Sequence, residues 1–168
     1  MDLSAGTAQF TILAFAGLLI AAAASDWHSL TVPNRYSLAL VALFPSYAIA
    51  TGGDVAWLAH LAYGAGAFIV GFLLFTLRVC GGGDVKLFAA VALWAGPALF
   101  VPMTLYTALS GGLMATVLWL TYKVRRATVP PSPQMTADNA AFAKQPMPYA
   151  VAIAAGGLFV ALQLLMGV

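Results

Sequence analysis

Six long apolar runs, separated by short polar connections, constrain the fold of this chain more than any other feature. A helix of about 20 apolar residues crosses the roughly 30 Å hydrocarbon core of a bilayer. Only 7% of the residues are charged, against about 25% in soluble domains, so the bilayer must be the main solvent. The sequence therefore predicts an all-α, polytopic membrane helical bundle with about six transmembrane helices. The runs lie at about Thr7–Ala24, Tyr36–Ala50, Val55–Leu77, Leu87–Phe100, Met103–Tyr122 and Tyr149–Val168.

The ends of these runs carry further information. The first follows Asp2 and no basic residue, which is unlike a cleaved secretory signal, so we expect a retained helix. Gly96-Pro97 and Pro102 separate the fourth and fifth runs, and because proline disrupts a helix interior, a tight hairpin is predicted there. The second and fourth runs are only about 15 residues long, which suits helices that begin at a polar cavity.

The basic residues predict how the bundle is oriented. With six spans, all seven fall in the loops after the first, third and fifth spans. By the positive-inside rule these loops are cytoplasmic and both termini are extracytoplasmic. We expect one membrane-embedded domain, residues 1–168, whose loop 123–148 is rich in proline and extended. The basic residues are Arg35, Arg78, Lys86, Lys123, Arg125, Arg126 and Lys144.

Two acids stand out in a chain that has no glutamate and only five aspartates. Asp26 ends the first span and Asp84 precedes the fourth, so the predicted topology places both at the cytoplasmic face. An ionisable residue at the membrane boundary is costly, which makes it a candidate for function. The alternatives are an ordinary interfacial charge for Asp26 and a simple helix N-cap for Asp84.

The three glycines at 81–83 precede Asp84 directly. Because glycine reaches φ > 0 without steric cost, this stretch predicts a sharp, flexible bend, with Gly83 a candidate for positive φ. Asp84 is then the expected N-cap of the helix that Leu87 begins.

These residues resemble the motifs of the type IV prepilin peptidases, a family of GxGD membrane aspartyl proteases. The last run is similar to the opening of that family's last helix, except that Ala150 replaces the usual glycine. The resemblance extends along the whole chain in the family's order. The residues that carry it are Asp26, Val32-Pro33-Asn34, Gly81-x-Gly83-Asp84-x-Lys86-Leu87 and Pro148 to Gly156.

The resemblance implies that Asp26 and Asp84 form a catalytic pair that cuts the leader from prepilins or pseudopilins at the cytoplasmic membrane face. Two adjacent carboxylates share a proton, so one acts as base and the other as acid. Gly81, Gly83, Lys86, Pro33 and Asn34 are the expected supporting residues. The chain resembles the short, peptidase-only members that serve Flp or Tad pili, rather than larger members that also N-methylate their product.

Several roles stay open at this stage. Lys86 suits either a site residue or a lipid-headgroup anchor. His28 suits either a group that tunes Asp26 or a solvated loop residue, and His60 is expected to be interfacial and outside the site. An archaeal-type preflagellin peptidase would use the same motifs. A small proton or cation transporter would also place acids in the membrane.

No cofactor or metal is expected, because Cys80 is the only cysteine and no His or Asp cluster has ligand spacing. The net charge of +2 gives no reason to expect nucleic acid as a partner. The expected partners are prepilin substrates and the lipid bilayer.

Overall fold

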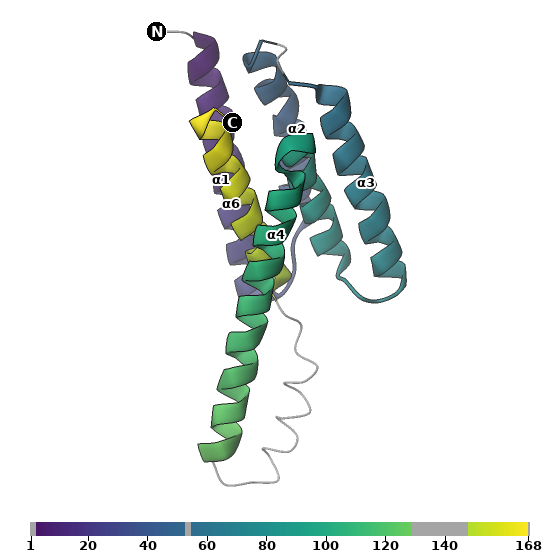
Figure 1. Ribbon diagram of the computed structural model, residues 1–168, viewed down its shortest axis with the longest axis vertical. Helices are drawn as coiled ribbons and strands as arrows, with labels where there is room; N and C mark the ends of the chain where they lie inside the picture. The colour runs from purple at the N-terminus through teal and green to yellow at the C-terminus, as the bar shows by residue number, and fades with distance from the viewer. Residues whose placement is uncertain (1–2, 53–54, 129–147, 168) are drawn as a thin grey trace.

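The computed structural model describes residues 3–52, 55–128 and 148–167, and every regular element within these ranges is an α-helix (Figure 1). The prediction of an all-α membrane bundle is therefore confirmed in its class. Four helical stretches in the described ranges are long and apolar enough to cross a membrane: Gly6–Ser29, Trp57–Thr76, Gly82–Val124 and Tyr149–Met166. The helices are α1 (Leu3–Ser29), α2 (Asn34–Ala50), α3 (Trp57–Thr76), α4 (Gly82–Thr128) and α6 (Tyr149–Met166).

Helix α4 reverses direction within its length. Gly96 has φ 56° and ψ −164°, so residues 82–95 form a first limb and residues 97–128 a second. The first limb runs beside α3, and the second returns beside α6 (Figure 1). The predicted hairpin is thus present. The prediction that Pro102 also interrupts the chain is wrong, because Pro102 lies inside the helical second limb. Gly96 alone makes the break, and Pro97 suits the first position of a helix because its missing N–H needs no partner.

His60 completes this reversal. In a continuous helix the Leu93 carbonyl would accept a hydrogen bond from residue 97, but Pro97 has no N–H. The His60 Nδ1 atom lies 2.8 Å from that carbonyl oxygen, and since a carbonyl only accepts, the Nδ1 atom is the donor. A Cβ at Gly96 would lie 2.3 Å from the His60 ring. His60 is therefore half-buried and has a structural contact, while its predicted position at the membrane interface stays a prediction.

Replacing His60 should destabilise the bundle. We expect His60→Leu to leave the Leu93 carbonyl without its donor, at a cost of about 1–3 kcal/mol. Thermal unfolding in detergent should show a lower midpoint for His60→Leu than for His60→Asn, whose amide retains an N–H. A midpoint for His60→Leu equal to that of the unsubstituted protein would contradict this role.

A cluster of aromatic side chains forms the core beside the reversal. Trp94, fully buried, stacks on Phe15 of α1 at 4.3 Å between ring centroids and meets Phe44 of α2 edge-on at 5.7 Å. Its Nε1 atom donates to the Leu40 carbonyl at 2.9 Å, which satisfies the only polar atom of the indole. These contacts join α1 and α2 to the first limb of α4.

The outer surface of the bundle is apolar. Large hydrophobic side chains are exposed on all five helices, for example Phe10 on α1, Ile49 on α2, Leu58 on α3, Leu109 on α4 and Leu162 on α6. A water-soluble monomer rarely exposes so extensive an apolar surface, whereas lipid tails cover it at no cost. Together with the spans above, this surface identifies a multi-pass membrane protein.

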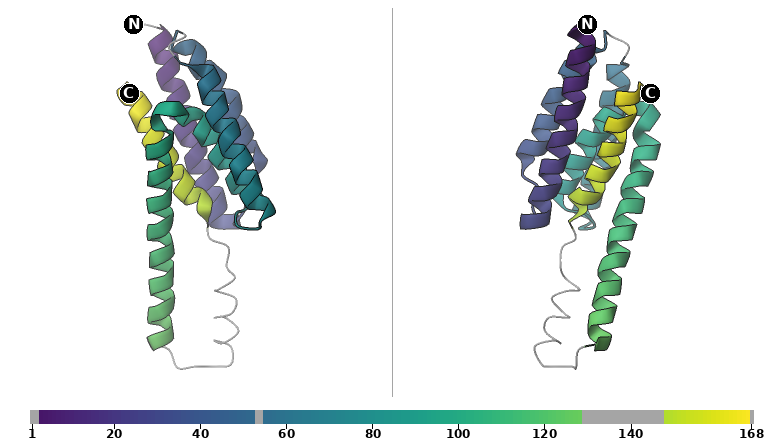
Figure 2. Two further views of the ribbon diagram at one scale, coloured as in Figure 1. Left: turned by 45° about the vertical axis from the view of Figure 1, so that its right-hand side comes forward. Right: turned by 90° about the vertical axis from the view of Figure 1, so that its left-hand side faces the viewer.

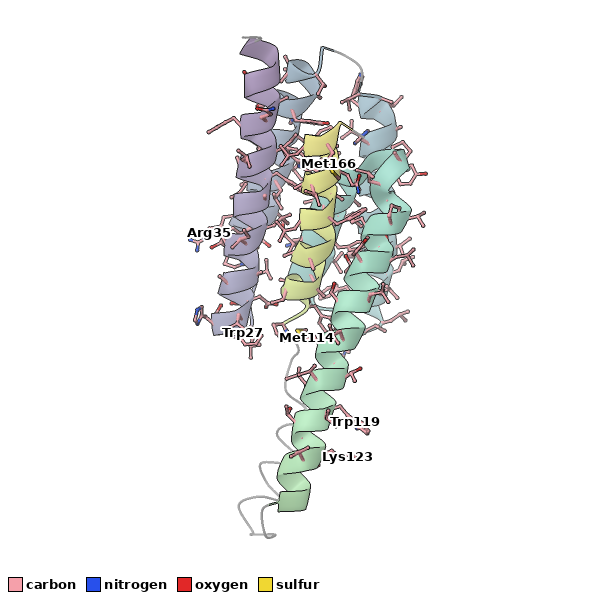
Figure 3. All side chains as sticks on the ribbon, turned by 60° about the vertical axis from the view of Figure 1, so that its left-hand side comes forward. Trp27, Arg35, Met114, Trp119, Lys123 and Met166 are labelled. Carbon is pink, nitrogen blue, oxygen red and sulfur yellow. The ribbon has the colours of Figure 1, made fainter. Side chains whose placement is uncertain are left out.

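The two ends of the bundle differ. The start of α1 and the end of α6 lie at one end, and the α1–α2 and α3–α4 connections lie at the other (Figures 1 and 2). At about 1.5 Å per residue the second limb of α4 is about 48 Å long, and it projects beyond this second end, carrying Trp119 and Lys123 (Figure 3). Helix α4 continues through Thr128, so the proline-rich loop begins after that residue and not at Lys123 as predicted. Residues 129–147 lie outside the described residues.

Candidate active site

Asp26 and Asp84 line one cavity of about 350 Å³ at the end of the bundle away from the start of α1 and the end of α6. Asp26 comes from the last turn of α1, and Asp84 comes from the first turn of α4. The other residues of the wall belong to the α1–α2 connection, the glycine stretch and the start of α6. They are Leu30, Thr31, Val32, Gly81, Gly82, Gly83 and Tyr149. The structure thus brings together two carboxylates that are 58 positions apart in the sequence.

Asp26 is held at the N-terminus of α6. Its side chain is only 4% exposed, and its Oδ2 atom accepts a hydrogen bond from the Ala150 backbone N–H at 3.0 Å. The first N–H groups of a helix lack partners within the helix, and the helix dipole there favours negative charge. This contact therefore satisfies a buried donor and fixes the direction of the Asp26 carboxylate.

The α1–α2 connection is held by its own side chains. Leu30 adopts φ 52°, a left-handed conformation that ends α1, and its N–H donates to the Asp26 carbonyl at 2.8 Å. The Ser29 hydroxyl donates to the Ser25 carbonyl at 2.7 Å and lies 3.0 Å from the Thr31 hydroxyl. These bonds hold the backbone that forms one wall of the cavity.

Asp84 is the third residue of α4, so the prediction that it is the N-cap is wrong. The helix begins at Gly82, because Val85 N–H already donates to the Gly81 carbonyl at 3.2 Å. Asp84 is half-buried, and none of the described residues donates a hydrogen bond to its carboxylate. An acid in the first turn remains favourably placed toward the helix dipole.

The glycines at 81–83 are needed for close packing and not for positive φ. The prediction of a bend built on positive φ at these residues is therefore wrong. Positive φ in this connection belongs to Arg78 (φ 60°) and not to residues 81–83. A Cβ on Gly83 would lie 3.2 Å from both the Cβ and the carbonyl oxygen of Val32. A Cβ on Gly81 would lie 2.8 Å from the Asp84 Oδ2 atom. Both glycines therefore leave room, one for the α1–α2 connection and the other for the carboxylate.

The remaining predicted residues lie beside the cavity. The Lys86 ammonium donates to Asn34 Oδ1 at 3.0 Å, so two of the expected supporting residues bind each other. Pro33 is the N-cap residue of α2 and extends the backbone toward Val32 (φ −60°, ψ 137°). His28 is exposed in the last turn of α1 and is not part of the cavity wall.

Sequence reasoning missed the contribution of α6. Tyr149 lines the cavity, and the Ala150 N–H binds Asp26. The motif from Pro148 to Gly156 was a usable signal, since it matched the family pattern, but it does not say which backbone group points at which carboxylate. Because the contact uses the backbone N–H, alanine in place of the usual glycine retains it.

The arrangement suits acid–base chemistry. When two carboxylates line one cavity, the charge of either makes ionisation of the other more costly, so one tends to stay protonated while the other is ionised. One of them then accepts a proton while the other donates one. Within the described ranges, no group of three His, Cys, Asp or Glu side chains has the geometry to hold a metal ion.

Comparison with known proteins gives two matches. Residues 13–116, more than half of the chain, match the model of the type IV leader peptidase family, and this range includes both aspartates. A Bacillus subtilis (strain 168) protein named prepilin leader peptidase/N-methyltransferase is 28% identical over 153 residues, which cover 89% of this chain and 54% of that protein. The chain thus spans about half the length of this curated relative. No solved structure matches the chain.

Proposed function

Because the chain belongs to the type IV leader peptidase family, we propose that it is a membrane aspartic endopeptidase that removes the leader of Flp-like prepilins at the cytoplasmic membrane face. The observation that carries this proposal is the shared cavity of Asp26 and Asp84. Asp26 comes from α1 and Asp84 from α4, and the fold brings these two distant parts of the sequence to one cavity at one end of the membrane bundle. We take residues 1–168 to be a single peptidase domain.

The proposed reaction needs one water and the two carboxylates. The ionised aspartate takes a proton from the water as its oxygen attacks the scissile carbonyl carbon, and the protonated aspartate gives its proton to the carbonyl oxygen. The tetrahedral intermediate collapses when the first aspartate protonates the leaving nitrogen. The second aspartate then recovers its proton from the hydroxyl of the intermediate, which restores the starting pair.

The contacts of the two acids suggest how the roles divide. Asp26 accepts the Ala150 N–H at the N-terminus of α6, and a donor to a carboxylate favours its charged form. Asp84 has no such donor among the described residues. We therefore assign Asp26 as the starting base and Asp84 as the starting acid.

The proposed orientation has six crossings, with the cavity at the cytoplasmic face. Counting α2 and both limbs of α4 as crossings gives an even number, which agrees with the start of α1 and the end of α6 lying at the same end. Lys86 lies near the start of α4, at the opposite end, and Lys123 lies beyond that end (Figure 3). The positive-inside rule then places this end in the cytoplasm.

Reporter fusions test that orientation. A reporter that is active only in the cytoplasm should work when it is inserted within residues 129–145, and it should fail when it is fused after Val168. A matched reporter that is active only outside the cytoplasm should give the reverse pattern. The opposite result from both reporters would place Asp26 and Asp84 on the outer side and exclude cytoplasmic leader removal.

Co-expression tests the proposed substrate class. In a host without its own prepilin peptidase, the protein should shorten a Flp-like prepilin by the length of its leader, as read on a gel. An archaeal preflagellin in the same host is the comparison substrate. Faster processing of the preflagellin would assign the alternative peptidase, and no processing of either would reject the proposal. A transporter role has no support from two acids in a cavity at one end of the bundle.

A further inference from the structure

A second cavity, of about 410 Å³, lies between α2 and α3 and is separate from the cavity that contains the aspartates. Helices α2 and α3 both pack against α4 but make no substantial contact with each other, so the first limb of α4 forms the floor between them. We call this cavity the lateral groove. Its wall is formed by Leu38 and Val41 from α2, Ala65 and Phe68 from α3, and Ala90 and Leu93 from α4.

The floor of the groove lies close to the helix backbone because its residues are small. Gly64 of α3 packs so tightly on α4 that a Cβ there would lie 3.0 Å from the Leu93 Cβ. Ala65, Ala89 and Ala90 also contribute to the wall. Small residues let another apolar segment approach a helix backbone closely within a membrane. From Lys86 to Leu93 the groove follows about 10 Å of α4, or two helical turns.

One end of the groove is polar and adjoins the candidate active site. Lys86 and Asn34, bonded to each other, belong to the groove wall. Lys86 lies two residues after Asp84, and Asn34 lies two residues after Val32, and both of these residues line the aspartate cavity. The groove therefore starts where the active-site cavity ends.

Lys86 has unused donors at this polar end. An ammonium has three N–H donors, and Asn34 accepts only one from Lys86. Ser37 also lines the groove, and its hydroxyl is buried with no hydrogen-bond partner among the described residues. A buried hydroxyl without a partner is unfavourable unless something binds it. A peptide backbone brings carbonyl acceptors to such donors.

We propose that the lateral groove binds the apolar segment of the substrate that directly adjoins the scissile bond, an inference that rests on the proposed peptidase function. The groove lies in the side of the bundle, so a segment that occupies it lies in the hydrocarbon region, where its side chains must be apolar and its backbone groups need partners. The groove gives apolar walls to its side chains. Lys86 gives donors to its carbonyls at the point where it enters the active site.

Photo-crosslinking tests the occupant directly. A photoreactive residue replaces Leu38, in the groove, or Ile69, which is 60% exposed on α3 and outside the groove. Both variants carry Asp84→Asn, so that a bound Flp-like prepilin is not cut. We expect an adduct with the apolar segment of the prepilin from position 38 and not from position 69. Phospholipid adducts alone at position 38, or equal prepilin adducts from both positions, would overturn the proposal.

Kinetics of groove-filling variants give a second readout. Ala65→Phe should raise the KM for the prepilin about tenfold, the effect of losing about two buried methylene groups, with a smaller change in kcat. Ala62→Phe is the matched control, since Ala62 is exposed on the same helix but outside the groove. Equal KM values for these two variants would overturn the groove while leaving the peptidase function intact. An inactive unsubstituted protein would reject the peptidase function, and the crosslinking would still decide what occupies the groove.

Discussion

Processing of a prepilin should be lost when either Asp26 or Asp84 is replaced by asparagine. The amide has nearly the same shape but neither takes up nor releases a proton at neutral pH, and general acid–base catalysis contributes about 10²- to 10⁴-fold per group. Asp26→Asn retains an oxygen that accepts the Ala150 N–H, so the packing of α1 on α6 should persist. Leader loss, measured at matched membrane levels of each variant, is the readout.

Asp54→Asn is the control for this experiment. Asp54 lies between the second and third apolar runs, in a loop that the predicted six-span topology places on the opposite side of the membrane, and we expect this variant to process prepilin normally. Full activity of Asp26→Asn or of Asp84→Asn would contradict the paired mechanism. Loss of activity with loss of the protein from the membrane would assign the aspartate to folding.

Gly83→Val should also cripple turnover, for a steric reason. The new Cβ would lie 3.2 Å from the Val32 Cβ and its carbonyl oxygen, and the two methyl groups would add to the overlap. The start of α4 must then shift away from the α1–α2 connection and carry Asp84 with it. A misplacement of about 1 Å in a catalytic group costs about 10²-fold in rate, so we expect a loss of that order.

Gly82→Ala is the matched substitution one residue earlier. Its Cβ would lie 3.3 Å from the edge of the Phe75 ring, which is 45% exposed and free to move aside. We expect processing within a few-fold of the unsubstituted rate, measured as the initial rate at matched protein levels. Equal rates for Gly83→Val and Gly82→Ala would show that the packing of Gly83 on Val32 does not position Asp84.

Hydropathy was sufficient to predict the helices of the bundle. Each predicted run is helical over most of its length, because in lipid every backbone group needs a partner within its own helix. The reversal at Gly96 was also predictable, since glycine followed by proline both permits positive φ and starts a new helix well. Pro102 was misread because a proline in a long helix removes only one hydrogen bond and need not end the helix.

The approach of Asp26 to Asp84 followed from counting predicted spans, since an even number of crossings between them returns the chain to the same face. Counting spans does not predict which residues of different elements contact one another. The Ala150 N–H on Asp26, the His60 donor to Leu93 and the bond from Lys86 to Asn34 each join residues more than 30 positions apart. Such pairs depend on how helices pack. The same holds for Gly83, whose constraint comes from Val32 and not from its own φ.

The most direct test of the two-aspartate peptidase uses purified protein in lipid vesicles with a synthetic Flp-like prepilin and EDTA. The measured quantity is the leader peptide released, identified by mass. We expect the unsubstituted protein to release one leader of defined length without added metal, and a protein that carries both Asp26→Asn and Asp84→Asn to release none. Leader release by the doubly substituted protein, or restoration of EDTA-inhibited release by zinc, would contradict the two-aspartate mechanism.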